Sequence, residues 1–146
     1  MKFWDASALI PLCLHERETA SLKKLAQADE AIVAWWASPV ECLSALARLR
    51  REDALSLHEE GQAQTILRSL MSGWIGIEPS EAVLEQAARV LRLHPVRAGD
   101  SLQLASALVW CQGDPTRHEF VCLDQRLRDA ARREGFVILP ISCRKA

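Results

Sequence analysis

The chain has 146 residues, of which 49% are hydrophobic and 25% are charged, and its formal net charge is −1. This length fits a single domain, residues 1–146, which buries roughly 70% of its unfolded surface on folding. The near-neutral charge excludes a generally basic surface. Any nucleic-acid binding therefore has to come from a local basic patch, or from a dimer that pools such patches.

The cysteines are odd in number and form no CxxC pair. They are Cys13, Cys42, Cys111, Cys122 and Cys143. Most lie in apolar segments, where a free cysteine packs as a small core residue, so we expect neither a zinc site nor disulfides. A reducing, cytoplasmic location follows most simply. No long apolar run precedes Asp5 and no stretch reaches transmembrane length, so we expect no signal peptide and no membrane contact.

Five short β-type runs divide the chain. They span residues 2–5, 31–35, 74–78, 119–123 and 136–139. Helical patterns fill the gaps between these runs, and an alternation of strands with helices predicts an α/β domain with a mainly parallel sheet. Residues 37–73 carry no strand signal, and they predict a helical hairpin against one side of the sheet.

Several helices have recognisable ends. Ser56 and Glu59 form a capping-box pattern in front of an apolar helix over residues 57–71. The next helix follows residues 79–80 (Pro-Ser) and stops before Pro95. Residues 102–109 are apolar almost all round, which predicts the most deeply buried helix of the chain.

Four acidic residues stand at similar junctions, each at the end of a strand or in the first turn of a helix. They are Asp5, Glu41, Asp100 and Asp124. The carboxyl ends of parallel strands share one edge of the sheet, where ligands bind. Carboxylates gathered there repel one another unless a hard cation holds them, so the pattern predicts a metal site.

Helix capping is the alternative interpretation of each acid taken singly. Asp5, Asp100 and Asp124 are each suited to be a helix N-cap, and Glu41 is suited to a capping box with Ser38. Capping alone gives no reason for an acid to start the most buried helix. There, Gly99 precedes Asp100, and we expect that glycine to allow a tight entry and a close backbone approach.

Order and spacing of the motifs resemble a known family. The motifs are DASAL at 5–9, a single Glu41, RAGDSLQLA at 97–105, DQRL at 124–127, and the pairs AA at 130–131 and GF at 135–136. Together they resemble the PIN-domain ribonucleases, and most closely the VapC-like toxins of bacterial type II toxin–antitoxin systems. The resemblance runs from the first strand to the last.

This resemblance implies a PIN-like three-layer fold, with a central sheet of about four to five strands flanked by helices. It further implies an endoribonuclease that depends on Mg²⁺ or Mn²⁺, with Asp5, Glu41, Asp100 and Asp124 as the catalytic and metal-binding acids and Ser7 as the supporting hydroxyl. Such toxins are usually homodimers, and an antitoxin neutralises them by inserting its tail into the active-site groove. The family commonly has Thr or Ser two residues before the last acid, whereas this chain has Cys122.

Magnesium prefers oxygen ligands and keeps several waters, which suits carboxylates without His or Cys. We expect Asp5, Asp100 and Glu41 to hold the metal directly or through water, and Asp124 to complete the shell or orient the nucleophile. A PIN-type nuclease that is not a toxin, or a silent binding module whose acids are only caps, remains the alternative. A metal-free ribonuclease needs paired histidines, and a phosphohydrolase or receiver domain needs a lysine after a strand; neither pattern is present.

Arginines flank the predicted acidic site. Arg97 and Arg126 are candidates for contact with RNA phosphates. For the arginines of residues 126–133, a solvated helix face is the favoured interpretation, and contact with RNA phosphates is the alternative. Trp35 and Trp36 are adjacent, so in a strand one faces the core and the other faces the opposite side.

Overall fold

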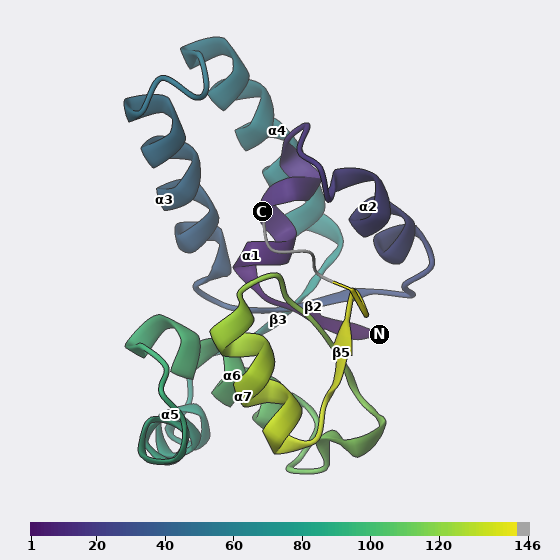
Figure 1. Cartoon of the computed structure of the whole chain (residues 1–146), viewed down its shortest axis with the longest axis vertical. Helices are drawn as coiled ribbons and strands as arrows, with labels where there is room; N and C mark the ends of the chain where they lie inside the picture. Colours follow the sequence, from purple (N-terminus) through teal and green to yellow (C-terminus); the bar gives the residue numbers. More distant parts are fainter. Residues whose placement is uncertain (143–146) are drawn as a thin grey trace.

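The structure is a computed structural model that describes residues 1–142. A five-stranded sheet lies at its centre (Figure 1), and all its strand pairs are parallel. The strands are β1 (Lys2–Trp4), β2 (Ile32–Trp35), β3 (Ile75–Ile77), β4 (Glu119–Val121) and β5 (Val137–Leu139). Each strand falls within one of the predicted β-type runs, so the predicted α/β class is confirmed.

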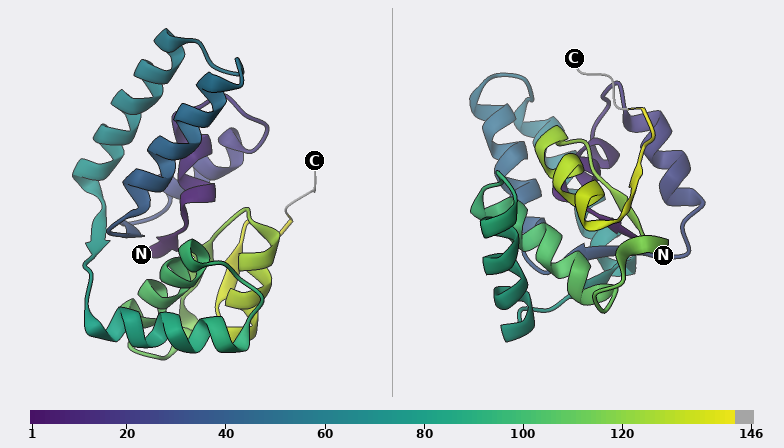
Figure 2. Two further views of the ribbon diagram at one scale, coloured as in Figure 1. Left: turned by 90° about the vertical axis from the view of Figure 1, so that its left-hand side faces the viewer. Right: turned by 60° about the horizontal axis from the view of Figure 1, so that its bottom comes forward.

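Helices cover both faces of the sheet. They are α1 (Ala6–Leu9), α2 (Thr19–Gln27), α3 (Ser38–Arg51), α4 (Leu57–Gly73), α5 (Glu81–Leu93), α6 (Ala98–Trp110) and α7 (Gln125–Glu134), with the 3₁₀ turns η1 (Ile10–Cys13) and η2 (Pro115–Arg117). The views in Figures 1 and 2 place α1–α4 on one face and α5–α7 on the other. Side chains alternate along β1, so Phe3 packs against α5–α7 and Trp4 packs against α1–α4.

The predicted helical hairpin is formed by α3 and α4, which project away from the sheet in Figure 2. The predicted capping box at the start of α4 is confirmed. The Ser56 hydroxyl accepts from the Glu59 amide at 3.1 Å, and the Glu59 carboxylate accepts from the Ser56 amide at 3.0 Å. Helix α6 is buried along most of its length, as its apolar pattern predicts.

The order of the strands in space is β3-β2-β1-β4-β5. The chain therefore builds outward from β1 in one direction and later returns to build outward in the other. In an open parallel sheet, a crevice opens at such a reversal, outside the carboxyl ends of the two central strands. The amide of Asp5 donates to the Val121 carbonyl at 3.0 Å, which continues the β1–β4 pairing up to this crevice.

One arginine of the predicted solvated face is in fact buried. Arg128 is only 2% exposed. Its guanidinium donates to the carbonyls of Cys122 (2.7 Å), Leu139 (3.3 Å) and Pro140 (2.7 Å). The side chain points inward from α7, toward carbonyls at the ends of β4 and β5, and the Leu139 carbonyl also accepts from the Cys122 amide at 3.0 Å. The prediction of a solvated or phosphate-binding side chain is wrong for Arg128.

The two adjacent tryptophans differ in burial. Trp35 is buried and Trp36 is 58% exposed, so Trp35 is the one that faces the core. Cys13, Cys42, Cys111 and Cys122 are buried free thiols, as expected of small core residues, whereas Cys143 lies outside the described residues. Among residues 1–142, no helix is both long and apolar enough to cross a membrane.

Candidate acidic active site

Asp5 stands directly after β1, and it is the N-cap of α1, as the capping interpretation predicts. Its side chain is 4% exposed. One carboxylate oxygen, Oδ2, accepts from the Ser7 amide at 3.0 Å and from the Ser7 hydroxyl at 2.5 Å. The predicted partnership of Ser7 with the first acid is therefore present in the structure.

The Ser7 hydroxyl also joins the two loops that meet at the crevice. Its Oγ accepts from the amides of Leu123 (2.9 Å) and Asp124 (3.4 Å), more than a hundred residues later in the chain. The Asp124 carboxylate accepts from the Leu127 amide at 2.9 Å and caps α7, again as predicted. The loop that carries Asp124 is thus fastened to Ser7 through its backbone.

Cys122 occupies the position where the family commonly has a hydroxyl. Its Sγ lies 3.6 Å from Asp5 Oδ2 and 3.6 Å from Ser7 Oγ. Burial, reinforced by the nearby Asp5 charge, raises the pKa of this thiol well above its usual value. The group is consequently a neutral thiol beside Asp5, and the firm hydrogen bonds to Asp5 come from Ser7.

Asp100 lies in the first turn of α6, but it is not the N-cap, and that expectation is wrong. The N-cap is Arg97, whose amide donates to Asp100 Oδ2 at 3.3 Å. Three residues of separation let a side chain fold back onto the first free amide of the helix. Gly99 lies within the same turn, and a Cβ there meets no atom of residues 1–142 within 4 Å, so the described part of the chain does not make the expected close backbone approach.

Glu41 does not form the predicted capping box with Ser38. Helix α3 already begins at Ser38, and Glu41 Oε1 instead accepts from Gln103 Nε2 at 3.0 Å. The same Nε2 donates to the Ser38 hydroxyl at 3.0 Å. Gln103 is not among the site residues that the sequence predicts, although an amide in the most apolar helix, three residues after Asp100, was the available signal.

The acids influence one another electrostatically. Burial raises the pKa of Asp5, and the charge of Asp100 adds to the effect. Burial likewise raises the pKa of Glu41 to about 7, with additions from Asp5 and Asp100. The pKa of Asp100 is raised by burial and by Asp124, against the opposing effect of nearby arginines. Loops and helices from all parts of the chain therefore bring the four predicted acids close enough to interact electrostatically.

The donor set fits a hydrated hard cation better than a closed cage. Among residues 1–142, no three His, Cys, Asp or Glu side chains stand at a spacing that encloses a metal ion. Magnesium, however, keeps several waters, and proteins usually bind it through one or two carboxylates together with substrate phosphates. Carboxylate oxygens with raised pKa values are suited to such an ion, because the cation relieves the repulsion between them.

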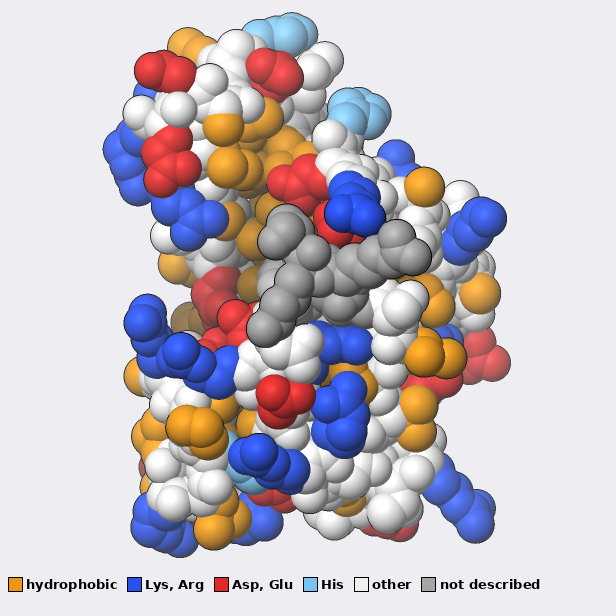
Figure 3. All heavy atoms as spheres, in the orientation of Figure 1, with side chains coloured by type: hydrophobic (Ala, Val, Ile, Leu, Met, Phe, Trp, Pro, Cys, Tyr) orange, Lys and Arg blue, Asp and Glu red, His pale blue; other side chains and the backbone are white. Residues whose placement is uncertain are grey.

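A cleft of about 790 Å³ forms the mouth of this site. Its lining residues are Arg97, Gly99, Asp100, Asp124, Gln125, Arg126 and Asp129. Figure 3 shows acidic side chains at the waist of the molecule, bordered by Lys and Arg side chains. The buried Asp5 and the half-buried Glu41 do not line the cleft. Asp100 and Asp124 are thus the acids that face solvent, next to Arg97 and Arg126.

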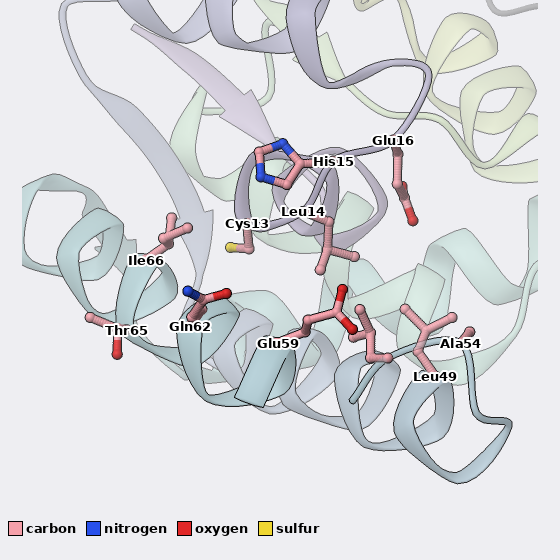
Figure 4. Close-up of a pocket in the computed structure, with 11 residues that line it drawn as sticks. Cys13, Leu14, His15, Glu16, Leu49, Ala54, Glu59, Gln62, Thr65 and Ile66 are labelled. Carbon is pink, nitrogen blue, oxygen red and sulfur yellow. The ribbon is translucent and has the colours of Figure 1, made fainter. Parts of the chain in front are cut away.

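A second pocket, of about 600 Å³, lies between η1 and the α3–α4 hairpin. Figure 4 shows Cys13, Leu14 and His15 on one side and Glu59 and Gln62 of α4 on the other. Burial raises the pKa of the Cys13 thiol to about 11, which makes it a poor nucleophile at neutral pH. None of the four acids lines this pocket, so it is no rival for the acidic site.

The raised pKa of Glu41 predicts how stability depends on pH. Between the usual value of 4.5 and about 7, the folded protein holds a proton that the unfolded chain has lost. This contribution to the free energy of unfolding is fully present below pH 4.5, and it is lost as pH rises through about 7. Urea unfolding with EDTA from pH 4.5 to 8 measures it. We expect Glu41→Gln, which keeps an acceptor for Gln103, to flatten the decline, and an unchanged slope contradicts the assignment.

No protein-family model matches this chain. Two curated proteins of Mycobacterium tuberculosis, named Ribonuclease VapC45 and Ribonuclease VapC49, are each 28% identical to it over 138 residues, or 94% of either chain. The solved structure of PAE2754 from Pyrobaculum aerophilum aligns with a TM-score of 0.66, at 20% identity over 94% of this chain and 88% of that one. FitAcB from Neisseria gonorrhoeae aligns with a TM-score of 0.63, at 13% identity over 94% of this chain and 96% of that one. The PIN-like fold is thereby confirmed, and so is the resemblance to the VapC-like ribonucleases that the sequence motifs indicate.

Proposed function

We propose that this chain is an endoribonuclease that hydrolyses RNA phosphodiester bonds with Mg²⁺ or Mn²⁺, and that it is the toxin of a toxin–antitoxin pair. One observation carries the proposal: acids from four distant segments meet at the crevice between β1 and β4. Ser7 joins Asp5 to the Asp124 loop, Asp100 and Asp124 line one cleft, and Glu41 bonds to the helix that carries Asp100. The ribonuclease names of the curated relatives support the reaction. The resemblance to VapC-like toxins supports an antitoxin partner, a homodimer and a single domain.

Each residue has a role in this proposal. A bound Mg²⁺ or Mn²⁺ supplies Lewis acidity, which lowers the pKa of water and offsets the charge that builds on the phosphodiester. Asp5, Glu41 and Asp100 hold the cation directly or through water. Asp124 either completes the group of residues that hold the cation or orients the attacking water. Ser7 keeps Asp5 in place and fixes the backbone on which Asp124 stands.

Arg97 and Arg126 are the candidates for contact with RNA. Both are exposed, both line the cleft, and both lower the pKa of Asp100 through their charge. A phosphate held between these guanidinium groups would lie beside the Asp100 carboxylate. Binding through such contacts weakens steeply as salt concentration rises.

A silent binding module of the same fold is the second candidate, and capping favours it. Asp5 and Asp124 cap their helices, and Asp100 accepts from the Arg97 amide, so each has a structural role without any metal. The two candidates differ in their response to divalent cations, because caps gain nothing from them. A non-toxin nuclease differs from a toxin in lacking a cognate antitoxin.

Addition of Mn²⁺ separates the nuclease from the binding module. A cation that binds only the folded state raises the free energy of unfolding by about 2.7 kcal/mol at a hundredfold excess over Kd. We expect this rise in urea unfolding, together with cleavage of a labelled RNA that stops in EDTA and returns with Mn²⁺. A well-folded sample that cleaves RNA in excess EDTA, or that neither binds Mn²⁺ nor cleaves, contradicts the proposal.

A further inference from the structure

We infer that Gln103 is a positioning residue that holds the Glu41 carboxylate for the divalent cation. This inference rests on the proposed function, and it assigns a specific role to a residue outside the four acids. Gln103 belongs to α6, the helix that carries Asp100, and it reaches across to α3, the helix that carries Glu41. The bond joins residues 62 positions apart in the chain.

Two pairs of residues face each other across these helices. Asp100 and Gln103 are three residues apart on α6, and Ser38 and Glu41 are three residues apart on α3. Side chains with this spacing lie on one side of a helix. The Gln103 amide donates to both members of the facing pair, at 3.0 Å to the Ser38 hydroxyl and 3.0 Å to Glu41 Oε1. The Gln103 amide therefore links α3, which carries Glu41, to α6, which carries Asp100.

The orientation of the amide follows from its partners. The NH₂ group faces Ser38 and Glu41, which suits the ionised carboxylate that a cation requires, because such a carboxylate accepts hydrogen bonds and donates none. Both of its hydrogens are then used, one by Ser38 and one by Glu41. The Gln103 oxygen, Oε1, is buried and has no hydrogen-bond partner within residues 1–142.

Core packing gives no reason for glutamine at this position. Gln103 is 0% exposed, and its neighbours Leu104 and Ala105 belong to the hydrophobic core. A buried amide with an unpaired oxygen destabilises the fold relative to an apolar side chain of similar volume. What the amide provides is a donor to Glu41, a half-buried acid whose other oxygen, Oε2, forms no hydrogen bond within residues 1–142.

Fixing one oxygen restricts the carboxylate and leaves the other free to meet a cation or its water. Groups that orient a metal-binding side chain typically change metal affinity or activity by about 10- to 100-fold when they are removed. Gln103 thus acts through Glu41, and it lies outside the set of groups that touch the metal or the RNA.

Gln103→Met tests the inference, because methionine has a similar length but no donor. We expect its Kd for Mn²⁺, measured by calorimetry on the full chain, to be about 10-fold or more weaker. The unfolding temperature in EDTA should change little, since the removal of the unpaired oxygen offsets the loss of the two donated hydrogen bonds. RNA cleavage should recover at saturating Mn²⁺, so that the metal requirement changes and the maximal rate does not.

Ser106→Ala is the matched control, because it removes another buried polar group of α6, whose hydroxyl donates within residues 1–142 to the Gln103 backbone carbonyl alone. Its Kd for Mn²⁺ should equal that of the unchanged protein. Gln103→Asn, which keeps an amide but shortens its reach by one methylene, should weaken binding as Gln103→Met does. A purely structural role is indicated instead if the variants lose thermal stability in EDTA and keep the original Kd, and that result overturns the inference. If the unchanged protein itself binds no Mn²⁺, the proposed function fails and the inference fails with it.

Discussion

Asp5→Asn and Asp100→Asn should each lower the rate of RNA cleavage by about a thousandfold or more, with the fold retained. An amide keeps the shape of the carboxylate but lacks the charge that holds a divalent cation. The cation contributes several kcal/mol of transition-state stabilisation, and each 1.36 kcal/mol corresponds to a factor of about ten in rate. Cleavage of a fluorescent RNA at saturating Mn²⁺ measures the loss.

Both variants should fold, because asparagine caps a helix as well as aspartate does at position 5, and at position 100 its amide oxygen can still accept from the Arg97 amide. Burial raises the pKa of Asp5 and of Asp100, so removal of either charge should leave the metal-free protein equally stable or more stable at pH 7. Asp114→Asn is the control: Asp114 caps η2 by accepting from the Thr116 amide, and it does not line the cleft. If both variants cleave RNA at a normal rate, neither Asp5 nor Asp100 takes part in catalysis.

Arg128→Met should lower the free energy of unfolding by about 3 kcal/mol, since hydrogen bonds from a charged donor contribute about 1.5–3 kcal/mol each and the desolvation of the guanidinium offsets part of the total. For a chain of this size, the unfolding temperature should fall by about 6–12 °C. The reason is that the carbonyls of Cys122 and Pro140 lose the donor that now satisfies them. Thermal unfolding in EDTA is the measurement.

Arg132→Met is the matched control on the same helix. Arg132 is exposed and pairs with the exposed Asp129, and such surface pairs contribute about 0–1 kcal/mol. Its unfolding temperature should therefore barely move. Equal stability of the two variants is incompatible with a structural role for the buried guanidinium. A loss confined to Arg128→Met supports the view that this side chain ties α7 to the ends of β4 and β5.

Much of the fold could be predicted because its signals are local. Short β-type runs separated by amphipathic helices predict a parallel sheet, and each strand of the structure falls inside a predicted run. The capping box at Ser56 and Glu59 depends only on residues three positions apart, and it forms as the pattern predicts. Alternation along a strand predicts that Trp35 and Trp36 differ in burial, but which of them is buried depends on helices contributed by other segments.

Predictions about the site failed where a distant residue competes with a local one. Asp5 and Asp124 cap their helices as predicted, because their partners lie two or three residues away. Glu41 was expected to bond to Ser38, yet it bonds to Gln103, which no local pattern connects to it. Arg128 was grouped with solvated arginines, because the charge pattern of a helix does not reveal carbonyls that lie at the ends of two strands.

The hydrogen bonds of Ser7 to Leu123 and Asp124 relate the site to the order in which the chain is made. They close a loop of more than a hundred residues, as does the pairing of β1 with β4 beside them. Closing so long a loop costs more entropy than local contacts do, and it needs both ends of the loop to be present. A nascent chain that stops short of β4 therefore carries Asp5, Glu41 and Asp100 without the strand that pairs with β1 and without the loop that bonds to Ser7. On the proposed function, RNA cleavage therefore has to await the synthesis of β4 and of the loop that carries Asp124.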